Sequence, residues 1–172
     1  ITGDLGITGT DEFTIIVGQI PVLIIDMDGN HNSAPKIVDA LNQIGISHEL
    51  VTTFPNNLSL YSSIFVCLGV YSNNHILTAQ QGSLLAAYLN DGGRLYMEGG
   101  DTWYYNSPTA VHAMFGILGQ GDGSGDLSTV VGMAGTFTEG MSFPYNGDNN
   151  WIDRIAPTGG GATLILQNNS PV

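Results

Sequence analysis

One stretch, Val22 to Asn30, constrains the fold of this chain more than any other. It reads Val-Leu-Ile-Ile-Asp-Met-Asp-Gly-Asn, so four apolar residues are followed by two acids, one on each side of a methionine, and then by a glycine. A short apolar run that ends in a turn signal is typical of a strand buried on both faces of a parallel sheet. Parallel strands of open α/β folds present their ligand-binding groups at their carboxyl ends. Asp26 and Asp28 are therefore predicted to lie at a functional edge.

Strand and helix patterns alternate along the chain after this stretch. Apolar residues at helical spacing, together with start and stop signals, predict two helices, and short apolar runs predict three further strands. This alternation implies right-handed crossovers and an α/β fold, a three-layer sandwich with a mainly parallel sheet in the order 2-1-3-4. The predicted helices lie at 33–45 and 78–90, and the predicted strands after the first lie at 48–52, 64–68 and 94–97.

The chain changes character after Gly116, where it becomes rich in glycine and carries only short β-prone pieces. A short helix starting at Ser107 is predicted before this change, because Ser-Pro is a common helix start. The β-prone pieces lie at 130–131, 136–138 and 162–166. They predict a β-rich C-terminal extension whose strands close the edge of the sheet.

The domain organisation is expected to be simple. A chain of 172 residues corresponds to about one domain. Residues 1–20 contain two Ile-Thr-Gly steps and a β-prone run, so they are predicted to be the tail of a preceding module or an edge strand. Residues 21–172 are predicted to form the α/β domain.

The composition excludes some partners. Three Lys and Arg against 15 Asp and Glu give a formal net charge of −12, which repels nucleic acids and anionic membranes. No apolar run approaches the roughly 20 residues that span a bilayer. A low content of charged residues with abundant glycine, together with a start at Ile rather than Met, leads us to expect an excised segment of a secreted bacterial protein, located outside the cell.

Acidic residues are the first candidates for a functional site. Asp26 and Asp28 from the first strand, with Glu98 and Asp101 after the fourth, would converge at the carboxyl edge of the sheet if the strand order is right. Hard oxygen ligands in this number suit calcium or magnesium, with Asp26 and Asp28 as the first metal ligands. The alternative is that these carboxylates cap turns and helix ends and that no cofactor is bound.

A second acidic motif, Asp122-Gly-Ser-Gly-Asp126, begins with the oxygen spacing of a calcium loop. It has Leu127 where an EF-hand needs Gly and Met133 where it needs Glu, so the full pattern fails. A surface loop rich in turns is the favoured interpretation.

Aromatic residues follow Asp101 directly. Trp103, Tyr104 and Tyr105, with Trp151 later in the chain, could form a platform for a glycan or peptide. The alternative is that the rings fill the space between the sheet and the C-terminal strands.

Two catalytic motifs are incomplete. Asp26-Met-Asp28-Gly resembles the first motif of haloacid dehalogenase-like phosphatases, which implies a nucleophilic Asp, an acid/base Asp and magnesium. That chemistry needs a cation near the phosphoryl oxygens, and the only lysine, Lys36, follows too early in the chain for that family's pattern. The turn after the fourth strand carries Gly99 and Gly100, where a nucleophile elbow needs Cys or Ser. An enzyme is therefore less expected than a non-catalytic domain.

A longer pattern extends through much of the chain, at Val22–Gly29, Ala40-Leu41 with Gly45, Leu84–Leu95, Gly99–Asp101, Phe137–Gly140 and Ile152–Pro157. In these residues the chain resembles the class I glutamine amidotransferase-like, flavodoxin-like accessory domains of large secreted bacterial proteins, often peptidases. The resemblance implies a flavodoxin-like fold without the elbow nucleophile. It favours a non-catalytic accessory or interaction module whose partners are neighbouring domains of the same chain; a metal-dependent phosphohydrolase and a carbohydrate-binding module are the alternatives.

Overall fold

The computed structural model describes residues 20–159 and 161–169. The predicted tail or edge strand at 1–20 lies outside these residues, except for Ile20, with which the first strand begins. The description of the β-rich extension lacks residue 160 and the last three residues.

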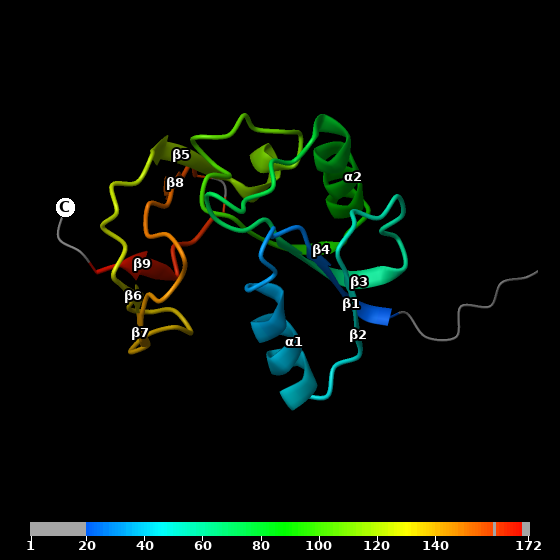
Figure 1. The fold of residues 1–172 in the computed structure, drawn as a ribbon, viewed down its shortest axis with the longest axis horizontal. Helices are drawn as coiled ribbons and strands as arrows, with labels where there is room; N and C mark the ends of the chain where they lie inside the picture. Colours follow the sequence, from blue (N-terminus) through cyan, green and yellow to red (C-terminus); the bar gives the residue numbers. More distant parts are fainter. Residues whose placement is uncertain (1–19, 160, 170–172) are drawn as a thin grey trace, which may run out of the picture.

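A four-stranded parallel sheet forms the centre of the fold, and its order β2-β1-β3-β4 confirms the prediction (Figure 1). The pairing places Asp26 beside Cys67, and Cys67 beside Glu98, at the carboxyl ends of three adjacent strands. The strands are β1 (Ile20–Asp26), β2 (His48–Val51), β3 (Tyr61–Cys67) and β4 (Arg94–Glu98).

Two helices, α1 (Ala34–Gln43) and α2 (Ala79–Asn90), pack against the sheet through alternate residues of its strands. In Figure 1 they lie on opposite sides of it. Helix α2 begins as predicted, because Thr78 and Gln81 form a reciprocal capping box. The core on the α2 side includes Leu23, Ile25, Ile64, Val66 and Leu85, and the core on the α1 side includes Val22, Ile24, Cys67 and Leu41.

The C-terminal extension consists of two separate antiparallel sheets, gathered on one side of the α/β part (Figure 1). One pairs β5 with β8, and the other has the order β7-β6-β9. The prediction that these strands close the edge of the parallel sheet is wrong. The elements are the short 3₁₀ helix η1 (His112–Phe115), β5 (Ile117–Gly121), β6 (Thr129–Gly132), β7 (Ser142–Pro144), β8 (Arg154–Pro157) and β9 (Leu166–Asn168).

Another predicted strand, at 136–138, is a turn instead. The Thr136 hydroxyl donates to the carbonyl oxygen of Met133, at 2.8 Å, and the Thr138 hydroxyl donates to the carbonyl oxygen of Ile165. Threonine hydroxyls that bond to the backbone in this way compete with strand pairing. The strand predicted at 162–166 begins only at Leu166.

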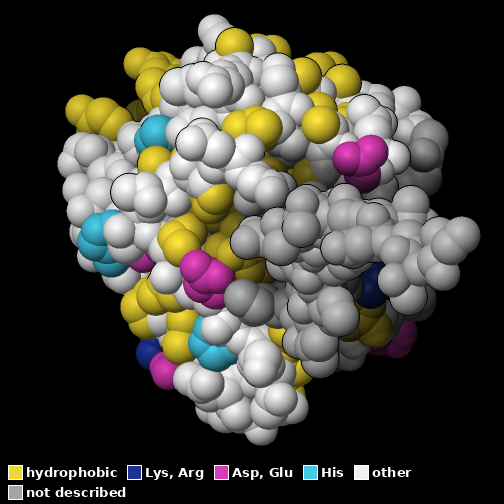
Figure 2. Space-filling model, turned by 90° about the vertical axis from the view of Figure 1, so that its right-hand side faces the viewer, with side chains coloured by type: hydrophobic (Ala, Val, Ile, Leu, Met, Phe, Trp, Pro, Cys, Tyr) yellow, Lys and Arg dark blue, Asp and Glu magenta, His cyan; other side chains and the backbone are white. Residues whose placement is uncertain are grey.

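The surface agrees with the acidic composition. On the face drawn in Figure 2, Lys and Arg side chains are few and hydrophobic side chains are exposed in several places. Within the described part of the chain, neither helix has the length and apolar character needed to cross a membrane.

Candidate functional site

The first predicted ligand, Asp26, is buried at the end of β1, where its side chain is only 3% exposed. Its Oδ1 accepts a hydrogen bond from the backbone N–H of Asp28, at 3.2 Å. Its Oδ2 lies 2.9 Å from Nδ1 of His31. Both oxygens of Asp26 therefore hold the turn that follows the strand.

Asp28 is equally buried and has the same kind of role. Its Oδ1 accepts from the N–H of Asn30, at 3.4 Å, and its Oδ2 accepts from the hydroxyl of Ser33, at 3.3 Å. Ser33 therefore bonds to Asp28 rather than capping α1, whose first turn has no side-chain cap. Each carboxylate oxygen of Asp26 and Asp28 has a protein partner, so the turn accounts for both side chains without a metal ion.

Glu98 lies on the same edge, beside Cys67. Its Oε2 accepts from the hydroxyl of Tyr96, at 2.8 Å. Burial raises the pKa of the Cys67 thiol well above its usual range, and the carboxylate of Glu98 raises it further. A buried thiol that stays protonated is not a nucleophile. The edge where an amidotransferase would carry out its chemistry therefore lacks a reactive cysteine in the described chain.

A different set of acids could hold a metal ion: Asp101, Asp122 and Asp153, whose carboxylates each offer an oxygen within 4.8 Å of the others. Asp101 follows β4, Asp122 follows β5 and Asp153 precedes β8. Because β5 and β8 are antiparallel and Gly121 pairs with Arg154, Asp122 and Asp153 lie at the same end of this strand pair. We call these three residues the Asp triad. Over residues 20–159 and 161–169, it is the one group of His, Cys, Asp or Glu that meets this spacing.

Asp153 is the most unusual member of the Asp triad. Its Oδ2 accepts from three successive backbone N–H groups, those of Trp103, Tyr104 and Tyr105, at 2.9, 2.7 and 3.3 Å. Its Oδ1 is buried and has no hydrogen-bond partner, a condition that no other side-chain atom of the described residues shares. The side chain as a whole is 8% exposed. An unsatisfied buried oxygen carries a free-energy cost that a bound cation would remove.

The electrostatics of Asp101 point in the same direction. Burial raises the pKa of Asp101, and the negative charges of Asp153 and Asp122 raise it further. Carboxylates this close to one another disfavour their common ionised state unless a cation or protons offset the repulsion. The Asp triad therefore has both oxygen ligands and an electrostatic reason to bind a cation.

The loops of the Asp triad approach each other closely because of their backbone. A Cβ at Gly123, next to Asp122, would collide with the backbone of Ile152, so only glycine allows this approach. Buried His112 supports the loop after β4: its Nε2 lies 3.0 Å from the carbonyl oxygen of Thr102, and its Nδ1 accepts from the N–H of Thr109, at 2.9 Å. Burial lowers the pKa of His112, so its ring is neutral near pH 7.

A cavity of about 280 Å³ adjoins the Asp triad. Two of the triad acids form part of its wall, and aromatic side chains form much of the rest. Trp103, which was predicted to belong to an aromatic platform, packs edge-to-face against His112 and Phe115 and is not among the lining residues. The lining residues are Tyr71, Asp101, Tyr105, Asp122, Asn149 and Trp151.

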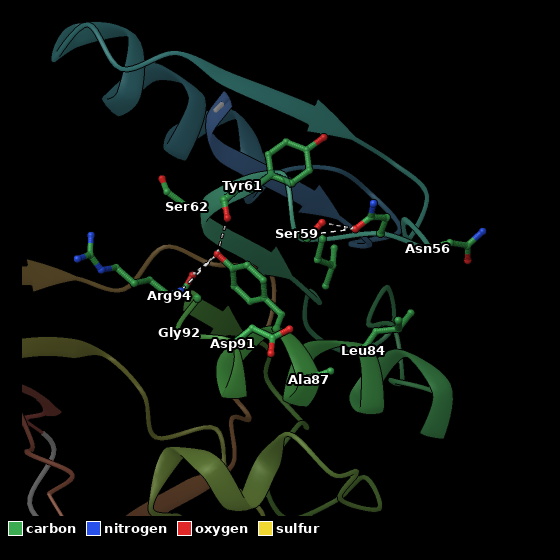
Figure 3. A pocket seen from close by; sticks show the side chains of 13 residues that line it. Asn56, Ser59, Tyr61, Ser62, Leu84, Ala87, Asp91, Gly92 and Arg94 are labelled. Atoms are coloured by element: carbon green, nitrogen blue, oxygen red, sulfur yellow. Dashed lines mark hydrogen bonds between the residues drawn. The ribbon is translucent and has the colours of Figure 1, made fainter. Parts of the chain in front are cut away.

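Two larger cavities lie elsewhere. One, of about 500 Å³, is at the carboxyl edge of the sheet and is lined in part by Lys36, Glu98 and Asp148, with neither Cys nor His in its described lining. The other, of about 480 Å³, is at the opposite end of the sheet (Figure 3). There the hydroxyl of Tyr88 bonds to the backbone of β3 and β4, which fastens α2 to the sheet, and the Arg94 side chain extends away from the other labelled side chains.

The structure thus brings only one predicted site residue, Asp101, into the Asp triad. Asp26, Asp28 and Glu98 do not belong to the triad. Trp103 is not a member either, but its backbone N–H donates a hydrogen bond to Oδ2 of Asp153. The sequence places Asp122 in a calcium-like spacing, which we interpreted as a surface loop. No sequence pattern predicted Asp153 as a site residue. The spacing around Asp122 was the signal that could have led to the site.

Comparison of the chain with models of protein families, with curated proteins and with solved structures finds no match. The chemistry of the site is therefore inferred from its own residues.

Proposed function

We propose that this chain is a non-catalytic accessory or interaction module of a secreted, multidomain bacterial protein, and that the Asp triad binds Ca²⁺. The ion would join the loop after the parallel sheet to the β5–β8 pair and so stiffen the module against its neighbouring domains. In this proposal the fold is a three-layer, flavodoxin-like sandwich of the glutamine amidotransferase-like class, and it works outside the cell.

One observation carries the calcium proposal: Asp153 Oδ1 is buried without a partner beside two further carboxylates. Turn-capping alone explains only the other oxygen, Oδ2, which receives three N–H groups. A cation ligated by Oδ1 would satisfy this atom and would offset the repulsion that raises the pKa of Asp101.

Calcium suits the triad better than magnesium. Ca²⁺ takes six to eight oxygen ligands at about 2.3–2.6 Å in flexible geometry, so two ligands on opposite sides of it lie about 5 Å apart. The triad oxygens fall within this span. Mg²⁺ demands shorter, near-octahedral distances and usually keeps several waters. Loop-borne carboxylates therefore favour Ca²⁺, with a dissociation constant of about 0.1–1 mM, as in extracellular modules.

The catalytic alternative has less support. A phosphohydrolase would need Asp26 and Asp28 to bind magnesium and to attack phosphorus, but both carboxylates are engaged in the turn after β1. An acyl-transfer enzyme would need a reactive thiol, and Cys67 is buried with a raised pKa.

Isothermal titration calorimetry tests the proposal. Chelator-treated protein is titrated with Ca²⁺ and, separately, with Mg²⁺, and the same titrations are made on Asp122→Asn and on Asp39→Asn. Asp122 is exposed in the triad, while Asp39 is an exposed acid of α1, so each variant loses one negative charge. We expect binding of Ca²⁺ by the wild type and by Asp39→Asn, and none by Asp122→Asn. Binding that survives in Asp122→Asn contradicts the assignment.

A further inference from the structure

We infer that the cavity beside the Asp triad binds a neutral saccharide, whose hydroxyl groups complete the coordination of the Ca²⁺ ion. This inference rests on the proposed function, because it requires an ion in the triad. It names a ligand class and a set of ligand-contacting residues for that site.

The first support is the aromatic lining. Tyr71, Tyr105 and Trp151 line the cavity, and they are 67%, 70% and 51% exposed. They come from three loops, those after β3, after β4 and before β8. Exposed rings gathered around one cavity are typical of a recognition surface, and their flat apolar faces fit the C–H face of a sugar ring.

The second support is that the backbone at two of these aromatic residues is held in place. The side chain of Asn149 connects two of the loops: its Nδ2 donates to the carbonyl oxygen of Tyr71, at 3.2 Å, and its Oδ1 accepts from the N–H of Trp151, at 2.8 Å. The hydroxyl of Tyr145 in turn donates to the carbonyl oxygen of Asn149, at 2.7 Å. A lining ordered before the ligand arrives lowers the entropic cost of binding.

The third support is the position of the acids. Asp101 and Asp122 both line the cavity, so an ion held by the triad would lie at its wall. Three N–H groups already bond to Asp153 Oδ2, so the Asp triad leaves at most five oxygens for an ion, fewer than the six to eight that Ca²⁺ takes. The open coordination positions would then face the cavity, where a pair of neighbouring hydroxyl groups can occupy them.

The negative charge of the protein and the volume of the cavity restrict the class of ligand further. A net charge of −12, together with two carboxylates in the cavity wall, disfavours an anionic ligand. A cationic peptide would be attracted to the same carboxylates, but it would compete with Ca²⁺ rather than require it. The volume of about 280 Å³ is at the low end for ligand pockets, which suits a single terminal sugar ring.

The test has two steps, so that its outcomes separate the inference from the proposed function. Calorimetry with Ca²⁺ alone comes first. The protein is then applied to an array of immobilised mannose, galactose, fucose, glucose and N-acetylglucosamine and their short oligomers, in buffer with Ca²⁺ or with EDTA. Calorimetry with the free form of any retained sugar gives its affinity.

We expect at least one neutral sugar to be retained with Ca²⁺ and lost with EDTA. Replacing a central aromatic contact commonly costs more than 1.4 kcal/mol, so Trp151→Ala and Tyr105→Ala should each weaken binding at least about tenfold. Phe137→Ala removes an aromatic side chain that is 78% exposed on the turn between β6 and β7, outside the cavity lining, and should leave binding unchanged. Circular dichroism checks each fold, and Tyr105→Ala decides if Trp151→Ala does not fold.

The following results overturn the inference. Ca²⁺ binding without retention of any sugar refutes it and leaves the calcium site intact. Sugar binding that is unaffected by EDTA or by the variant of Tyr105 also refutes it. Failure of Ca²⁺ to bind refutes the inference and the proposed function together.

Discussion

Two acidic regions of this protein differ in how their carboxylate oxygens are satisfied. At the end of β1, the four oxygens of Asp26 and Asp28 bond to groups that follow within seven residues in the chain. In the Asp triad, three acids meet from distant loops, and Asp153 Oδ1 is buried without a partner. Acids close in sequence can be satisfied by the turn they form, whereas acids brought together by the fold retain their mutual repulsion. Only the second situation gives the protein a reason to bind a cation.

The largest effect is expected for Asp153→Ala. This change leaves the N–H groups of Trp103, Tyr104 and Tyr105 without their acceptor and should lower the free energy of unfolding by about 3 kcal/mol. Urea unfolding with Ca²⁺ and with chelator measures it, and Asp39→Ala is the control. Because Asp153 is also a ligand in the proposed calcium site, the variant should lose its response to Ca²⁺. If the free energy of unfolding falls by less than about 1 kcal/mol in the presence of chelator, the three N–H groups find other acceptors.

Asp28→Ala should cost about 2 kcal/mol, since it leaves the N–H of Asn30 and the hydroxyl of Ser33 without their acceptor. This cost should be the same with Ca²⁺ and with chelator, because Asp28 holds a turn and not an ion. Urea unfolding under both conditions gives the two values. If the variant loses the stabilisation that Ca²⁺ gives the wild type, the contrast between the two acidic regions fails.

Asp122→Asn should behave in the opposite way to Asp28→Ala: its effect on stability should depend on Ca²⁺. At a Ca²⁺ concentration tenfold above its dissociation constant, the wild type gains about 1.4 kcal/mol, or roughly 3–6 °C in melting temperature for a chain of this size. The variant should lose this gain, while its stability in chelator should be unchanged or slightly raised, because one repelling charge is gone. Differential scanning calorimetry measures both values. A variant that still responds to Ca²⁺ places the ion elsewhere.

The smallest effect concerns pH. The pKa of Asp101 is raised in the folded protein, so in chelator its protonation favours folding, and that contribution is lost as pH rises through the folded pKa. Asp101→Asn has no charge to lose, so in chelator it should be more stable than the wild type near pH 7, and the difference should vanish below the ordinary pKa of about 4. With Ca²⁺ near pH 7 the order should reverse. Melting curves from about pH 3 to pH 7 test this, since they extend below the ordinary pKa of Asp, and a difference independent of pH would contradict it.

The pH dependence of wild-type stability also contains a contribution from His112, which is opposite in sign to that of Asp101. Its pKa is lowered by burial, so the stability that depends on its neutral form is present above pH 6.5 and is lost as pH falls through the folded pKa. Comparing Asp101→Asn with the wild type cancels this contribution, because both proteins retain His112.

The sequence was sufficient to predict the parallel sheet because its signals are local. Three of these signals each act over only a few residues: the apolar run at 22–25, the cap at Thr78 and the helical spacing that follows it. They mark an alternation of strands and helices, and this alternation predicted the strand order correctly. The end of β1 was also recognised, with two open interpretations of its acids. Counting the donors around Asp26 and Asp28 needs coordinates, and that count favours the turn-capping interpretation.

The Asp triad could not be predicted in the same way. Its assembly depends on the pairing of β5 with β8, strands that carry weak signals because one is rich in glycine and the other ends in Pro157. A two-residue error in this pairing would move Asp122 away from Asp153. The approach of Asp101 further depends on how the extension packs beside the parallel sheet, and no local pattern encodes that arrangement.

The most direct test of the account is an anomalous difference map from crystals of the wild-type protein grown with Ca²⁺. We predict a peak between the carboxylates of Asp101, Asp122 and Asp153, with Asp153 Oδ1 among the ligands, and none at Asp26 or Asp28. An ordered triad without a peak, or a peak at the end of β1 instead, would contradict it.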